Sequence, residues 1–254
     1  KAIKLNPNFV EAYTNMGNIL YIMGNMKEAE SVQKKAIQLD PNFATAYSNL
    51  GDIYKDSAKF NDAIKSYKDS LKLDKNLSSA KLGLITSKAN ICDWSDQNIQ
   101  NIWLEKLGIE GSAINPWDLF SIEDNPLKHL KRSRNLYKEI YIRKESKISY
   151  KKSKKKKIHV GYFSSDFRAH PTMYLINSIL RLHDKSKFKI YLYSFTPKED
   201  EFTNIAKNSG CIFRDIKELN NKEASELAKQ DELDIAIDLM GYIKYNRMSI
   251  FSYR

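Results

Sequence analysis

The stretch Ile158–Thr172, IHVGYFSSDFRAHPT, decides the fold of the second half of the chain. It begins as a mostly apolar, β-favouring run, which predicts a buried strand, and small polar residues then break this run. His170 stands directly before Pro171, a residue type favoured in the first turn of a helix. Ligands of open α/β sheets bind beyond the carboxyl ends of the strands. His170 is therefore a candidate site residue, although a loop histidine without a function fits the same pattern.

The sequence after this stretch alternates between strand-like and helical patterns. The strand-like runs are Ile158–Phe163, Lys189–Phe195, Cys211–Ile216 and Asp234–Met240, and the helical stretches are Pro171–His183, Glu199–Asn208 and Lys222–Asp231. This alternation predicts a parallel sheet covered by helices, which amounts to half of a doubly wound α/β domain. No glycine-rich GxGxxG loop follows any of these runs, so the dinucleotide fingerprint is missing from the sequence.

A second group of candidate residues follows the last strand-like run. Gly241 comes first, and glycine lets the backbone approach a ligand closely. Lys244 and Arg247 come next, and both side chains suit an anion. We therefore predict that Lys244 and Arg247 contact substrate.

The beginning of the chain carries a repeat with a period of 34 residues. The matching pairs are Leu5–Phe9 with Leu39–Phe43, Ala12-Tyr13 with Ala46-Tyr47, Asn15 with Asn49, Gly17 with Gly51, and Ala29 with Ala63. A third copy starts at Leu73 and then degrades. This period predicts tetratricopeptide repeats, which are pairs of antiparallel helices stacked into a superhelix.

Asn15 and Asn49 occupy the same position on the first helix of successive repeats. A row of side-chain amides can donate to and accept from an extended peptide backbone of any sequence. Solvated polar residues on a helix surface fit the same spacing. Gly83 stands at the next step of the period, so the row stops there.

The remaining sequence is divided by its composition. We expect repeats over 1–83, a helical connector over 84–147 packed around Trp94, Trp103 and Trp117, a basic linker over 148–157, and an α/β lobe over 158–254. Nine Lys/Arg and one Glu between Arg143 and Lys157 give a local charge of +8, which leaves +3 of the total +11 for the rest. Such a run is typical of a solvated linker, although it also suits an acidic partner, and we expect no nucleic acid.

Other features of the composition exclude several classes. No apolar run approaches the ~20 residues of a membrane span, and no signal peptide opens the chain. Cys92 and Cys211 lie far apart and match no metal spacing, which indicates a cytoplasmic protein without a metal site or a disulfide framework. The chain opens with Lys1 rather than Met, so we expect earlier repeats before it.

The motifs together resemble one family of enzymes. VGYFSSDFRAHPT, the run DIAIDLMGY with Lys244, Asn246 and Arg247 after it, and the Cys92-Asp93-Trp94 junction behind the repeats are similar to the O-linked N-acetylglucosamine transferases. That family also contains SPINDLY-type protein fucosyltransferases. The resemblance implies a repeat superhelix joined to a GT-B pair of Rossmann-like lobes, of which this chain would hold the first. It implies that a sugar moves from a nucleotide donor to Ser or Thr of a polypeptide.

The resemblance also assigns roles to residues. His170 matches the active-site histidine, Thr172 lies beside it, and Asn15 and Asn49 match an asparagine ladder that holds the acceptor polypeptide. The implied donor is UDP-N-acetylglucosamine, without a metal ion or another cofactor. GDP-fucose and a non-catalytic repeat scaffold remain the alternatives, although HPT and Gly241-Tyr242 favour the N-acetylglucosamine branch. Lys229 stands where the animal enzymes carry a histidine. Because the second lobe would supply most donor contacts, we expect the chain alone to be inactive.

Overall fold

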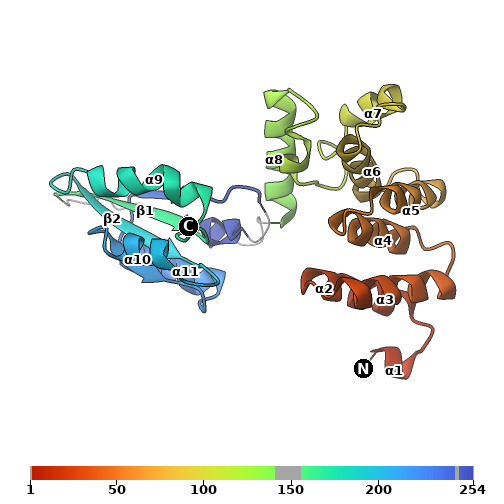
Figure 1. Cartoon of the computed structure of the whole chain (residues 1–254), viewed down its shortest axis with the longest axis horizontal. Helices are drawn as coiled ribbons and strands as arrows, with labels where there is room; N and C mark the ends of the chain where they lie inside the picture. The colour runs from red at the N-terminus through yellow and green to blue at the C-terminus, as the bar shows by residue number, and fades with distance from the viewer. Residues whose placement is uncertain (1, 141–155, 244–245, 254) are drawn as a thin grey trace. The chain divides into compact units, whose positions relative to one another are not determined.

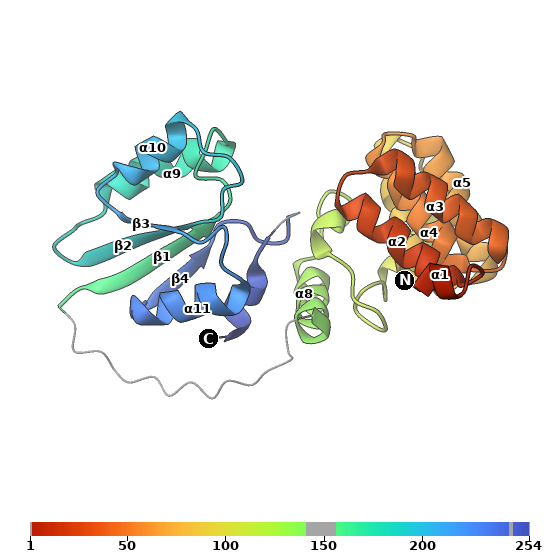
Figure 2. The same cartoon turned by 90° about the horizontal axis from the view of Figure 1, so that it is seen from below.

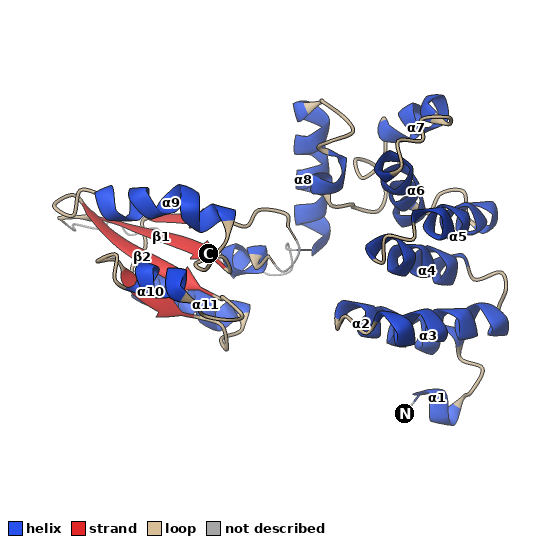
Figure 3. Ribbon diagram, viewed as in Figure 1, coloured by secondary structure: helices blue, strands red, loops and turns tan. Residues whose placement is uncertain are grey.

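The computed structural model describes residues 2–140, 156–243 and 246–253. It divides into two compact units, Lys1–Glu139 and Ile140–Arg254, and each is described by itself. Strands lie in the second unit only, as far as the described residues show, and the first unit is built from helices (Figure 3). The basic linker predicted over 148–157 falls largely outside the described residues.

The first unit is a stack of helical hairpins followed by further helices (Figure 1). Its helices are α1 (Ala2–Leu5), α2 (Val10–Ile22), α3 (Met26–Leu39), α4 (Ala44–Asp56), α5 (Phe60–Leu73), α6 (Ser78–Asn90), α7 (Gln97–Leu104) and α8 (Pro126–Ile140), with a 3₁₀ turn η1 (Pro116–Leu119). Helices α2, α4 and α6 begin 34 residues apart, and so do α3 and α5. The period therefore correctly predicted the tetratricopeptide hairpins.

One buried tyrosine holds the last repeats together. Tyr67 on α5 is fully buried, and its hydroxyl donates a hydrogen bond of 2.7 Å to Asp52 Oδ1 on α4. Burial is the main cause of a raised pKa for Asp52. A Cβ at Gly83 on α6 would lie 2.2 Å from Tyr67 Cζ, and one at Gly51 on α4 would lie 2.6 Å from Cε1. The ring needs both glycines, which explains why no asparagine continues the row at Gly83.

Replacing Gly83 by alanine should lower the free energy of unfolding of the first unit by about 1–3 kcal/mol. Overpacking a filled core costs about that much, and the clash outweighs a gain in helix propensity of about 1 kcal/mol. All three tryptophans of the chain belong to this unit, so urea unfolding followed by tryptophan fluorescence reports on it. Lys68→Ala on exposed α5 surface is the control. An unchanged midpoint for Gly83→Ala would contradict the packing described above.

The boundary predicted between 83 and 84 is wrong. Helix α6 runs through it, and Ile85 packs with Leu104, Leu107, Ile114 and Leu119 in one buried cluster. The helix of the third repeat is therefore continuous, and it supplies one wall of the core of the following segment. That segment belongs to the first unit as far as Glu139 and is not a separate domain.

Two buried cations hold the segment after the repeats. Lys88, whose side chain is 2% exposed, pairs with Asp93 at 3.0 Å and with Asp96 at 2.5 Å. Arg132 on α8 is fully buried, donates to the carbonyl oxygens of Leu104 and Leu107, and pairs with a carboxylate at Glu123. Charges removed from water require such partners, so these contacts fix the path of the chain.

The second unit is a four-stranded parallel sheet between two layers of helices, as predicted (Figure 2). Its strands are β1 (Ile158–Ser164), β2 (Phe188–Ser194), β3 (Ile212–Asp215) and β4 (Ile235–Asp238), and its helices are α9 (Pro171–Leu182), α10 (Glu201–Lys207), α11 (Asn221–Gln230) and the 3₁₀ helix η2 (Met248–Tyr253). One core contains Met173 and Leu180 of α9 and Ala206 of α10, and the other contains Ala224 of α11 and Ile250 of η2. This is the arrangement of a Rossmann-like lobe.

The strands are ordered β3-β2-β1-β4, and all neighbours are parallel. The chain moves outward from β1 through β2 to β3, and then crosses back to place β4 on the other side of β1. The order therefore reverses between β1 and β4. Ligands of open α/β sheets bind at such a reversal, outside the carboxyl ends of the strands.

Candidate functional site

The loops that follow β1 and β4 meet at this reversal of strand order. The amide of Leu239, just after β4, donates to the carbonyl of Phe163 in β1 at 3.1 Å. The sulfur of Met240 lies 3.4–3.5 Å from Ser164 Oγ and from the Ser165 amide and hydroxyl. The sheet thus brings together two segments that are about 75 residues apart in the chain.

The loop after β1 is buried and polar. Ser164 Oγ accepts a hydrogen bond of 2.9 Å from the Asp166 amide, and Ser165 Oγ donates to Asp166 Oδ1 at 3.2 Å. Asp166 has a side chain only 4% exposed. Short side chains that bind their own backbone favour a tight turn here, which directs the chain toward α9.

His170 is the N-cap of α9. Its backbone is extended, with φ −150° and ψ 148°, and Pro171 begins the helix as predicted. Its Nδ1 lies 3.3 Å from the Thr172 amide and 3.1 Å from Thr172 Oγ1. The side chain is 35% exposed, and among the described residues no hydrogen bond is made to Nε2. His170 therefore lies in the loop beyond the carboxyl end of β1 with its side chain partly exposed, and Thr172 contacts the ring directly.

Two aspartates support this histidine, and sequence reasoning singled out neither. Asp166 Oδ2 lies 3.4 Å from His170 Nδ1. Asp200 Oδ2 accepts a hydrogen bond of 2.7 Å from the amide of Ala169, and this bond is the main cause of a lowered pKa for Asp200. Asp200 also forms a capping box with Thr203 at the start of α10. The D-x-x-T pattern in the sequence could have predicted that cap. Nothing in the sequence could have predicted that Asp166 approaches His170.

The loop after β4 is organised by Asp238. Its carboxylate accepts hydrogen bonds of 3.0 Å from the amides of Met240 and Gly241, and burial is the main cause of its raised pKa. Gly241 adopts a positive φ of 57°, and the space beside its Cα is open. A left-handed residue with free space beside it agrees with a close approach of ligand to the backbone.

Of the two cationic residues predicted to contact substrate, the structure describes only Arg247. Lys244 lies outside the described residues. Arg247 donates from Nε to Asn221 Oδ1, from Nη1 to the carbonyl of Ile216, and from Nη2 to the carbonyl of Leu219, and burial lowers its pKa. These contacts tie η2 to α11, so an anion would have to share the guanidinium with them. The anion contact of Arg247 stays a prediction.

The repeats carry the other predicted residues, far from His170 in sequence. Asn15 is exposed on α2, and Asn49 is partly exposed on α4. The described residues make no hydrogen bond to either side chain. Asp56 lies seven residues after Asn49, which is about two helical turns further along the same face.

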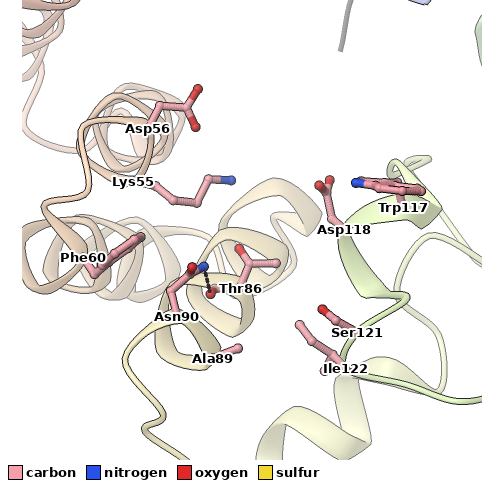
Figure 4. Close-up of a pocket in the computed structure, with 10 residues that line it drawn as sticks. All are labelled: Lys55, Asp56, Phe60, Thr86, Ala89, Asn90, Trp117, Asp118, Ser121 and Ile122. Carbon is pink, nitrogen blue, oxygen red and sulfur yellow. Dashed lines mark hydrogen bonds between the residues drawn. The ribbon is translucent and has the colours of Figure 1, made fainter. Parts of the chain in front are cut away.

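A pocket of about 460 Å³ opens beside this face (Figure 4). Its lining comes from α4 to α6 and from η1 with the residues after it: Lys55, Asp56, Phe60, Thr86, Ala89, Asn90, Trp117, Asp118, Ser121 and Ile122. Asp56 accepts a hydrogen bond of 2.7 Å from the Tyr21 hydroxyl, and burial raises the pKa of Asp118. The pocket shows that η1 adds side chains to the surface of the repeats, which the repeat period could not reveal.

Two negative findings concern the described residues alone. None of their helices combines the length and the apolar character that a membrane span needs. They also bring no three His, Cys, Asp or Glu side chains together in a way that could hold a metal ion.

Comparisons with known proteins agree with this architecture. The curated relatives include a probable UDP-N-acetylglucosamine–peptide N-acetylglucosaminyltransferase, SPINDLY, of Petunia hybrida, which is 30% identical over 107 residues. They also include the UDP-N-acetylglucosamine–peptide N-acetylglucosaminyltransferase of Caenorhabditis elegans, 34% identical over 100 residues. These matches cover 41% and 39% of this chain but only 12% and 9% of the two relatives. The chain therefore matches only about a tenth of their length.

A solved structure and two family models also match this chain. A mutant O-GlcNAc transferase of Thermobaculum terrenum shares the fold, with a TM-score of 0.55 and 21% identity over 99% of this chain and 43% of its own. A tetratricopeptide repeat model matches residues 9–76. The model of glycosyl transferase family 41 matches residues 128–254, which is half of the chain. The chain therefore belongs to glycosyl transferase family 41.

Proposed function

We propose that the whole protein transfers N-acetylglucosamine from UDP-N-acetylglucosamine to Ser or Thr side chains of polypeptides that the repeats hold. The observation that carries this proposal is the place of His170. In a chain that matches glycosyl transferase family 41, His170 caps α9 in the loop after β1, and the strand order reverses at β1. The names of the petunia and nematode relatives supply the sugar and the peptide acceptor.

The proposal treats the α/β unit as the first lobe of a GT-B enzyme, with the donor held beyond the strand ends. In the reaction, the acceptor oxygen bonds to the anomeric carbon, the bond from that carbon to the UDP oxygen breaks, and the acceptor loses its proton. In this proposal, His170 orients the reacting groups and Thr172 holds the ring. Gly241 allows the loop after β4 to approach the donor. The proposal needs no metal ion or other cofactor.

The proposal assigns the acceptor polypeptide to the repeats. Asn15 and Asn49 offer side-chain amides that are not used within the described residues, and a backbone can pair with them. The free cysteines Cys92 and Cys211 suit a reducing compartment, and we place the protein in the cytoplasm.

The proposal is tested by incubating the whole protein with polypeptide acceptors and one nucleotide sugar at a time. Mass spectrometry should find N-acetylhexosamine on Ser or Thr with UDP-N-acetylglucosamine and no modification with GDP-fucose. Transfer of fucose would assign the protein to the SPINDLY-type activity instead. Transfer of neither sugar, with a folded protein, would favour a repeat scaffold.

The double variant Asn15→Ala/Asn49→Ala should weaken transfer to long polypeptides more than transfer to short peptides. Each lost hydrogen bond to the acceptor backbone costs on the order of 1 kcal/mol, which is roughly fivefold in kcat/KM. Short peptides need not reach the repeats and should be little affected. The control Gln38→Ala/Asn61→Ala removes exposed amides from the second helices, α3 and α5, which do not carry the row. Equal losses for both acceptor lengths would remove the row from the acceptor site.

A further inference from the structure

Asp166 is a buried carboxylate whose two oxygens have different surroundings. Oδ1 accepts from Ser165 Oγ at 3.2 Å and from Arg168 Nη2 at 3.4 Å. Oδ2 lies 3.4 Å from His170 Nδ1, and the described residues make no hydrogen bond to it. The Asp166 side chain is only 4% exposed, although Oδ2 is not among the fully buried polar atoms that lack a partner. The imidazole lies close enough to Oδ2 for Nδ1 to donate a hydrogen bond to it after a small adjustment.

Nδ1 of His170 faces two partners with opposite requirements. The Thr172 amide, at 3.3 Å, can only donate and needs an unprotonated Nδ1. Asp166 Oδ2 can only accept and needs a protonated one. The Thr172 hydroxyl, at 3.1 Å, can donate or accept, so it fits both forms.

The charge on Asp166 decides between the two forms. A hydrogen bond to an ionised group is roughly twice as strong as one between neutral groups. The contact between Nδ1 and the Thr172 amide is long, and Thr172 is partly exposed. A water molecule can therefore replace Nδ1 as the acceptor for this amide. The Asp166 carboxylate is only 4% exposed, and it is the charged one of the two partners.

We propose that Asp166 is a positioning residue, which holds the proton of neutral His170 on Nδ1 and so leaves Nε2 able to accept a proton. The consequence for catalysis rests on the proposed function. As the Ser or Thr oxygen bonds to the anomeric carbon, its proton passes to Nε2, and the electron pair of the broken bond leaves with UDP. Without Asp166, the Thr172 amide would favour the form that carries the proton on Nε2, and the ring could only donate there.

The location of the proton can be measured on this chain without any transfer reaction. Long-range ¹H–¹⁵N correlation spectra of ¹⁵N-histidine-labelled protein at alkaline pH distinguish the two neutral forms. The chain has four histidines, and His170→Asn identifies the signals of His170. We expect wild-type His170 to carry its proton on Nδ1. Asp166→Asn should move it to Nε2, because a side-chain amide can donate to Nδ1.

Asp184→Asn is the matched control, because it makes the same change in a carboxylate of the same unit whose partner is the Ser186 amide rather than His170. It should leave the proton on Nδ1. A wild-type proton on Nε2 would overturn the proposal, even if Asp166→Asn failed to fold. Identical spectra for wild type and Asp166→Asn would overturn it too, and so would an equal effect of both variants.

The same variants give a kinetic readout in the whole protein. Asp166→Asn should lower kcat on the order of 10²-fold with little change in KM, as expected for a residue that acts through a catalytic base. Asp184→Asn, in the loop after α9, should keep kcat. An unchanged kcat for Asp166→Asn would contradict the catalytic consequence. If the wild-type protein transfers no sugar, the proposed function fails, while the spectra still decide where the proton lies.

Discussion

Replacing His170 by alanine should lower the turnover of sugar transfer by the whole protein about 10²–10⁴-fold at saturating substrate. Positioned groups that transfer or share a proton in the transition state contribute on this scale. We expect this effect because His170 lies in the loop beyond the carboxyl end of β1, its side chain is partly exposed, and its ring is held through Nδ1. Steady-state assays with UDP-N-acetylglucosamine and a polypeptide acceptor would measure the effect.

A second variant separates this chemistry from the cap that His170 provides to α9. His170→Asn keeps a favoured N-cap type but has no Nε2, so it should be about as impaired as His170→Ala. Leu175→Ala, at a residue that is 77% exposed on the same helix, controls for disturbance of α9. Near-normal turnover of either His170 variant would exclude this residue from the active site.

Replacing Arg132 by methionine should destabilise the first unit by about 3–5 kcal/mol. Removal of one partner leaves a buried charge and buried polar groups uncompensated, which has a cost of this size. Here the orphaned groups would be Glu123 and the carbonyls of Leu104 and Leu107. Urea unfolding followed by tryptophan fluorescence measures the loss, and Arg134→Met on the exposed side of α8 is the control.

The effect of Arg132→Met should depend on pH. Burial favours a higher pKa for Glu123, but hydrogen bonds from Arg132 and Lys128 outweigh it and hold the pKa below the usual 4.5. A lowered pKa stabilises the fold fully above the unfolded value, and this contribution disappears as the pH falls through the folded value. The difference between wild type and Arg132→Met should therefore shrink below pH 4.5. A loss under about 1 kcal/mol at neutral pH, or one independent of pH, would contradict this role of the pair.

Much of the fold could be predicted from local patterns. The 34-residue period located α2 to α6, because each hairpin repeats the same packing positions. The strand-like runs located β1 to β4 to within about two residues, since buried parallel strands are continuous apolar runs. Pro171 marked the start of α9.

Other features depended on contacts that no local pattern contains. Trp94 and Trp117 are about half exposed, whereas bulky aromatics were expected in the core. Arg132 lies in the interior, where its charge is paired by groups 9 to 28 residues away in the sequence. Gly83 seemed to end a row of amides, and only the position of the Tyr67 ring explains it.

The candidate site was likewise only partly predictable from the sequence. His170 and Thr172 could be selected as candidates from the sequence because both residues stand at the predicted start of a helix. Asp166 stands in the same motif, but its role depends on the turn that brings Oδ2 to 3.4 Å from Nδ1. The meeting of the β1 and β4 loops follows from the strand order, which the alternation of strands and helices does not determine.

The most direct test of the central claim combines His170 with the choice of donor. The whole protein and its His170→Asn variant would each be incubated with a polypeptide acceptor and UDP-N-acetylglucosamine, and the product analysed by mass spectrometry. We predict N-acetylhexosamine on Ser or Thr for the wild type and about 10²-fold less for the variant. Equal modification by both proteins, or none by the folded wild type, would contradict the assignment of the site and of the activity.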